Sequence, residues 1–112
     1  EMATSYKILG QAHLTTTSDT DIYTVPSATE TIISTMIVAN IGTAATTFNI
    51  ALREDGDALA NKHYIARNVP IASEDSTTLT LGMALEATDV VTVTAGAADL
   101  LSFNLFGAEI DV

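Results

Sequence analysis

The sequence predicts an all-β fold: a single-domain antiparallel β-sandwich of about eight strands, either jelly-roll or immunoglobulin-like, over residues 1–112. Apolar and polar residues alternate with a period of two along several short segments, which is typical of half-buried strands. Segments rich in Gly, Pro, Asn and Asp separate these stretches at the spacing of a sandwich. No long helical periodicity, internal repeat or linker divides the chain, and 112 residues suffice for one core.

The segments that we expect to form strands alternate in polarity or are rich in β-branched and aromatic residues. In chain order they are 6–14, 22–25, 31–39, 46–53, 62–66, 77–83, 90–94 and 100–106. Alternation is clear in 46–53, where Phe48, Ile50 and Leu52 share the face that we expect to point inward. Between strands, Asp55-Gly56 predicts a tight turn with positive φ, which glycine adopts freely.

The segment 31–39 (TIISTMIVA) is apolar on both of its faces. This pattern favours a central strand that is covered on both sides, or a strand whose second face meets a partner. We therefore expect self-association to involve this second face or the first strand. The candidate interface residues are Tyr6, Lys7, Ile32, Met36 and Val38.

The charge balance excludes two classes of partner. Four basic and fourteen acidic residues give a formal net charge of -10. This charge repels a phosphate backbone and anionic lipid, and no apolar run approaches the roughly 20 residues of a membrane-spanning helix. We therefore expect no nucleic acid and no membrane as partners. A hydrophobic share of 47% excludes a disordered chain.

The residues that usually carry enzyme chemistry are sparse. The absence of cysteine excludes disulfides, zinc-thiolate sites and thiol nucleophiles. His13 and His63 have no second ligand at a metal-like spacing, and His63 is interpreted as an outward-facing strand residue. No motif frames a serine nucleophile. We expect no enzyme, no catalytic residues, no metal and no cofactor.

One loop offers an alternative to this expectation. Glu54, Asp55 and Asp57 lie close together, and several carboxylates on one loop suit calcium. An EF-hand loop would need more oxygen ligands, which residues 58–60 do not provide. A solvated turn is therefore the favoured interpretation.

Several phrases occur in an order that resembles a family of small virion structural proteins of tailed phages. They are YKILGQ (6–11), YTVP (23–26), IVANIG (37–42), TFNIA (47–51), LTLG (79–82), DVVTV (89–93) and SFNLFGAE (102–109). Each phrase alone is weak, but the resemblance spans nearly the whole chain. It implies a location in the virion and carries over no catalytic residue.

Within that resemblance two functions stay open. The first is a capsid decoration or cement protein on the capsid surface, a homotrimer that binds the major capsid protein and stabilises the head. The alternative is a tail, baseplate or fibre component that binds a receptor or glycan, with Tyr6, Tyr23 and Tyr64 available to stack on sugars. An aromatic share of only 5% without tryptophan makes packing the favoured role of these tyrosines. A hydrolase or lyase on a jelly-roll scaffold is a third, less favoured hypothesis.

Overall fold

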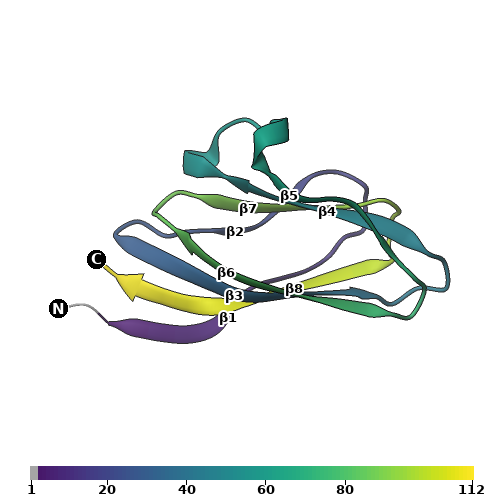
Figure 1. The fold of residues 1–112 in the computed structure, drawn as a ribbon, viewed down its shortest axis with the longest axis horizontal. Coiled ribbons are helices and arrows are strands. Elements are labelled where there is room, and N and C mark those ends of the chain that lie inside the picture. The colour runs from purple at the N-terminus through teal and green to yellow at the C-terminus, as the bar shows by residue number, and fades with distance from the viewer. Residues whose placement is uncertain (1–2) are drawn as a thin grey trace.

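The computed structural model describes residues 3–112 and confirms an all-β sandwich of eight strands (Figure 1). The strands are β1 (Thr4–His13), β2 (Thr20–Thr24), β3 (Thr29–Asn40), β4 (Thr46–Arg53), β5 (Tyr64–Ile71), β6 (Ser76–Leu85), β7 (Val90–Ala95) and β8 (Leu101–Asp111). Two turns of 3-10 helix, η1 (Glu54–Gly56) and η2 (Asn61–His63), connect β4 to β5. Within the described residues no helix is long and apolar enough to cross a membrane.

The strand order distinguishes between the two predicted sandwich types. One sheet has the order β1-β8-β3-β6 and the other β2-β7-β4-β5, with every neighbouring pair antiparallel. Every connection crosses from one sheet to the other except the one between β4 and β5. This is the jelly-roll arrangement, and the immunoglobulin-like alternative is not observed.

The core lies between the two sheets and consists of the side chains that alternate inward. Phe48 and Phe103, from opposite sheets, pack edge to face with ring centroids 6.3 Å apart. Ile50, Leu101 and Leu105 are fully buried beside them. The inward orientation predicted for Phe48, Ile50 and Leu52 is therefore confirmed, with Leu52 only partly buried against the core. The η1 turn has the predicted positive φ, 55° at Asp55 and 67° at Gly56.

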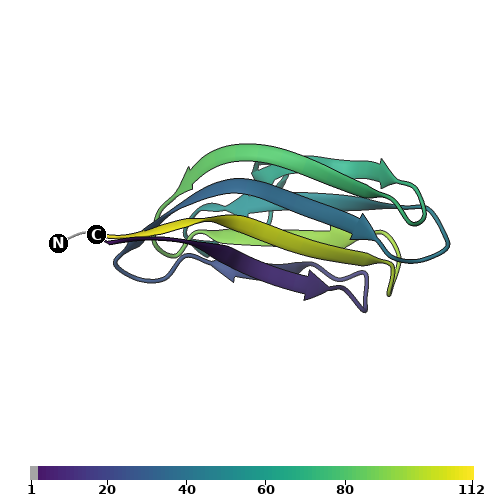
Figure 2. The same cartoon turned by 90° about the horizontal axis from the view of Figure 1, so that it is seen from below.

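A line of register shifts crosses the first sheet. β8 is continuous, whereas each strand beside it has one extra residue in the pairing. The register of β1 with β8 shifts between Ile8 and Gly10, and the register of β3 with β8 shifts between Ile33 and Thr35. Edge strand β6 shifts at the same level, next to Gly82 with φ of 64°. Such bulges bend strands and increase their twist. Figure 2 shows the resulting curvature of β3, β6 and β8.

The shift in β3 corrects the predicted interface. With an unbroken period of two, Ile32, Met36 and Val38 would share one face. The extra residue at Ser34 reverses the alternation, so Ile32 remains outside while Met36 and Val38 point into the core with no exposed surface. The prediction that Met36 and Val38 lie on an open face is therefore wrong, whereas β3 does occupy an interior position in its sheet.

The interpretation of His63 as an outward strand residue is also wrong. Residues 61–63 form η2, and the His63 side chain is buried. Its Nδ1 accepts a hydrogen bond of 2.9 Å from the Ala60 backbone N–H, which closes the turn before β5 begins. β5 is an edge strand and extends through Pro70, a residue that is tolerated at a sheet edge because it has no N–H to donate.

Gly10 gives a test of how the sandwich closes along β1 and β2. A Cβ at this position would lie against the Ile22 carbonyl oxygen, which is a backbone atom and cannot rotate away. Gly10→Ala should lower the free energy of unfolding by about 2–3 kcal/mol because the two strands must separate. Gly82→Asn is the control: a side chain there meets nothing, and Asn tolerates positive φ, so a loss of about 1 kcal/mol or less is expected. Urea unfolding of both variants measures the difference, and equal losses would contradict the close approach.

Candidate functional site

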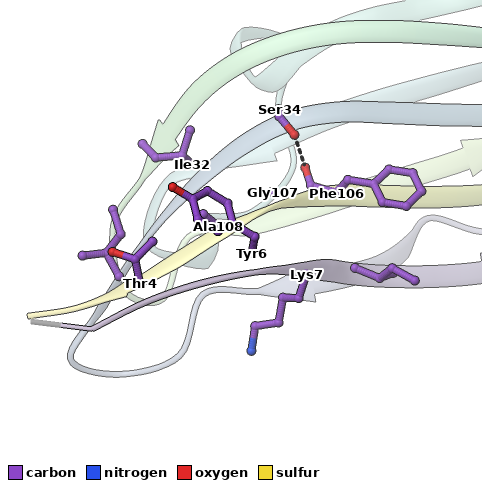
Figure 3. Close-up of a pocket in the computed structure, with 10 residues that line it drawn as sticks. Thr4, Tyr6, Lys7, Ile32, Ser34, Phe106, Gly107 and Ala108 are labelled. Carbon is purple, nitrogen blue, oxygen red and sulfur yellow. Dashed lines mark hydrogen bonds between the residues drawn. The ribbon is translucent and has the colours of Figure 1, made fainter.

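The outer surface of the β1-β8-β3-β6 sheet carries an apolar patch near the two ends of the chain. We call this patch the apolar face and define it by Tyr6, Ile8, Ile32, Phe106, Ala108 and Ile110. Together with Thr4, Lys7, Ser34 and Gly107 these residues line a shallow groove of about 730 Å³ (Figure 3). Large apolar residues are strongly exposed here, with Tyr6 86%, Ile8 52% and Ile32 39% accessible.

Strand register explains the shape of the groove. β8 lies between β1 and β3 and contributes the small residues Gly107 and Ala108, opposite Lys7 and Tyr6 of β1. A side chain on Gly107 would collide with the Ile32 carbonyl oxygen, so this position stays empty. On the outer surface β8 presents Phe106, Ala108 and Ile110, so the hollow lies over the small side chain of Ala108, between Tyr6 of β1 and Ile32 of β3.

The other half of the same sheet surface is polar. Gln11 Nε2 donates a 2.6 Å hydrogen bond to Asn104 Oδ1, and His13 Nε2 lies 3.1 Å from the Asp99 carbonyl oxygen. Gln11 and Asn104 are paired across β1 and β8 beyond the register shift. The bulges therefore coincide with the border between an apolar half and a polar half of one face.

A chain of polar contacts supports the edge of the groove. Lys7 Nζ pairs with Glu109 Oε1 at 2.5 Å, Tyr23 OH donates to Glu109 Oε2 at 2.5 Å, and Tyr23 OH lies 2.7 Å from Thr31 Oγ1. These contacts join β1, β8 and β3 to β2 of the opposite sheet. Among the residues 3–112 that the structure describes, Lys7 is the one charged residue that lines the groove, and it pairs with Glu109.

The same contacts shift two ionisation equilibria. The hydrogen bonds from Lys7 and then Tyr23 stabilise the Glu109 carboxylate and hold its pKa below the ordinary value. Burial, followed by the neighbouring Glu109, raises the pKa of the Tyr23 phenol well above its usual range. At neutral pH the network therefore consists of a carboxylate between an ammonium group and a neutral phenol.

The structure places the five predicted interface residues in two locations. Tyr6, Lys7 and Ile32 meet at the groove, whereas Met36 and Val38 belong to the core. Four members of the apolar face were not among the predicted interface residues, namely Ile8, Phe106, Ala108 and Ile110. Ile8 shares the period-two face of Tyr6, and this signal was sufficient to find it.

The loop carboxylates considered for calcium lie at a different place. Glu54, Asp55 and Asp57 face Glu86 and Asp89 across a polar hollow of about 410 Å³. Asp89 accepts hydrogen bonds of 2.8 Å from the backbone N–H groups of Asp55 and Glu86, so it ties the two loops together. In the part of the chain that the structure describes, no group of three or more side chains is placed to hold a metal ion.

Arg53 fixes the base of this acidic loop. Its Nη2 contacts both carboxylate oxygens of Asp21 at 3.0 Å, and its Nε donates to Thr92 Oγ1 at 3.0 Å. Its Nη1 donates to the carbonyl oxygens of Gly56 and Asp57. One guanidinium therefore binds β2, β7, η1 and the residue after η1, which is a structural role.

Glu109 gives a test of the polar chain through pH. Because its pKa is lowered in the folded state, its ionisation stabilises the fold above the pKa of the unfolded carboxyl, and this contribution is lost as pH falls through the folded pKa. Glu109→Gln should therefore lower stability at pH 7 and flatten the loss of stability between neutral pH and pH of about 3. Urea unfolding at both values measures this. Glu30→Gln, an exposed carboxylate on β3, should keep the wild-type pH dependence; if Glu109→Gln does so too, the network does not couple to folding.

The comparisons with known proteins identify relatives in fold. The sequence matches no protein-family model and no curated protein. A chain from the acid-stable capsid of Helicobacter pylori bacteriophage KHP30 is similar over 98% of this chain and 93% of its own, with TM-score 0.55 and 14% identity. A chain from Bacillus endospore appendages, described as a novel family of disulfide-linked pili, is similar over 99% of this chain and 88% of its own, with TM-score 0.56 and 13% identity. The chain therefore shares its sandwich fold with a phage capsid structure and a pilus structure.

Proposed function

We propose that this chain is a structural protein of a tailed-phage virion, and that it acts as a capsid decoration or cement protein that stabilises the head. The observation that carries the proposal is the apolar face. A chain with a net charge of -10 leaves a continuous apolar surface open on one sheet, although polar residues cover the other half of that sheet. Exposed patches of this kind mark surfaces that bind other proteins.

Two further observations support a virion role. The sequence phrases resemble virion structural proteins of tailed phages. One of the similar folds comes from a phage capsid and the other from pili, and both are assemblies of protein subunits. The proposal assigns no enzymatic activity to the chain.

As to assembly, we propose a homotrimer at a local threefold position of the capsid surface, with the major capsid protein as the second partner. In a closed ring each copy is held by several contacts at once, so each single contact can bury a small area. The apolar face provides a surface for such contacts.

A receptor- or glycan-binding module of the tail, baseplate or fibre is the second candidate. It is favoured by Tyr6, whose exposed ring beside a groove is available to stack on a sugar. Tyr23 does not contribute to this function because its hydroxyl is committed to Glu109 and Thr31.

Counting the copies of this chain in each virion tests the proposal. Quantitative mass spectrometry of purified virions, scaled to the major capsid protein, should find hundreds of copies because decoration follows the many local symmetry positions of a capsid. A dozen or fewer copies would favour the tail candidate. Virions without the chain would overturn both.

Self-association should depend on salt. Each copy carries a net charge of -10, and at physiological ionic strength charges beyond about 8 Å are largely screened. Light scattering should therefore show association that strengthens between low salt and physiological salt. A purified chain whose association weakens over this range would contradict a contact made by the apolar face.

A further inference from the structure

We propose that His63 is a pH-sensitive switch, which keeps the connector between β4 and β5 closed only while its imidazole is neutral. By the connector we mean residues 54–63, which project from the outer side of the β2-β7-β4-β5 sheet (Figure 1). The inference goes beyond the proposed function and does not depend on what binds the apolar face. It rests on the burial of the ring, the roles of its two nitrogens and the charges on the elements around it.

His63 is the one buried residue of the connector, with 6% of its surface accessible. Hydrogen bonds from Arg53 fix the connector up to Asp57, and β5 begins at Tyr64. Between these two points, residues 58–62 are exposed or only partly buried. The His63 ring is therefore the side chain that anchors this segment to the sandwich.

The two ring nitrogens have fixed roles. A backbone N–H can only donate, so the 2.9 Å hydrogen bond from Ala60 requires an unprotonated Nδ1 and places the proton of the neutral ring on Nε2. Within residues 3–112, Nε2 is buried and has no hydrogen-bond partner. Protonation adds a hydrogen to Nδ1 that points at the Ala60 N–H, so neither N–H group of the imidazolium has an acceptor. A buried charge without partners is strongly disfavoured, and the charged ring must therefore leave its site.

The charges on the surrounding elements do not compensate a positive charge on His63. Strand β4, which η2 contacts, carries one charged residue, Arg53. The turn η2 itself contributes Lys62. Strand β5 contributes Arg67, whose guanidinium lies 4.5 Å from the ring centre of Tyr64. The charged groups on the elements that pack at His63 are therefore cations.

The carboxylates of the connector lie at a different place. Glu54, Asp55 and Asp57 line the polar hollow described above, and His63 is not part of that lining. Among the described residues no carboxylate forms an ion pair with the imidazole. Nothing in this part of the chain therefore stabilises the protonated ring in the closed connector.

The capping box shows how histidine differs from the usual residue at this position. In that motif the side chain of the third helical residue, usually Glu or Gln, accepts a hydrogen bond from the N–H of the residue before the helix. His63 has this role in η2, with the N–H of Ala60. A Gln side chain keeps its acceptor at every pH, whereas an imidazole in water loses it with a pKa of about 6.5. His63→Gln is therefore the matched variant that closes the turn without titrating.

Hydrogen exchange of the Ala60 amide tests the switch. Because only the open connector binds the proton, and an imidazole in water has a pKa of about 6.5, the open population should rise about 30-fold between pH 8 and pH 5. The protection factor of the Ala60 amide, corrected for the intrinsic effect of pH, should fall by the same factor. The amides of β4 and β7 should keep their protection, because the two sheets stay folded.

Two variants are the controls. His63→Gln should protect the Ala60 amide equally at both pH values. His13→Gln should retain the fall seen in the wild type, because it removes only the other histidine, which is exposed on β1. Glu109 does not interfere, since its pKa is held below the ordinary value and its carboxylate stays ionised at pH 5.

The proposal is overturned if the Ala60 protection factor of the wild type is constant, or if it falls equally in His63→Gln. An equal fall at the β4 and β7 amides also overturns it, because the sandwich and not the connector would then open. If His63→Gln does not fold, nitrogen-15 spectra of the wild-type ring decide. Protonation of Nδ1 must coincide with the loss of Ala60 protection, and a protonated ring beside a protected Ala60 amide overturns the proposal.

Discussion

Strand β8 sets the geometry of the first sheet, because it continues without a shift while β1 and β3 on either side of it each shift in register. This mismatch fixes which side chains of the neighbours point outward. On one side of the shifts Tyr6, Ile8 and Ile32 reach the outer surface, and on the other side Met36 enters the core. The curvature, the groove and the division of the face into apolar and polar halves all follow from the same register.

The strand pattern could be predicted because it depends on local periodicity. Phe48 and Ile50 alternate with polar residues, so their burial was readable from the sequence alone. The bulge at Ser34 carries no local signature, since Ser and Thr on either side of a shift look like ordinary strand residues. The orientation of Met36 and Val38 was therefore predicted from an unbroken period of two, and the bulge in β3 interrupts that period.

The candidate site was only partly predictable because it joins distant segments. Tyr6 meets Ala108 and Ile32 only after β8 has inserted between β1 and β3, which requires the whole chain to fold. The ion pairs also join distant segments, so the sequence alone did not predict them. Lys7 and Arg53, two of the four cations, pair with Glu109 and Asp21, so two cations and twelve acidic residues lie outside these pairs and the net charge of that remainder is still -10.

The irregular edge strands β5 and β6 affect how copies at high local concentration can associate. A sheet edge presents unpaired N–H and C=O groups that can recruit another strand and extend into a fibre. Here β6 is interrupted beside Gly82, and β5 contains Pro70, which cannot donate. Growth by strand addition is hindered at these two of the four edge strands. Closed contacts between faces therefore have an advantage over open-ended polymerisation.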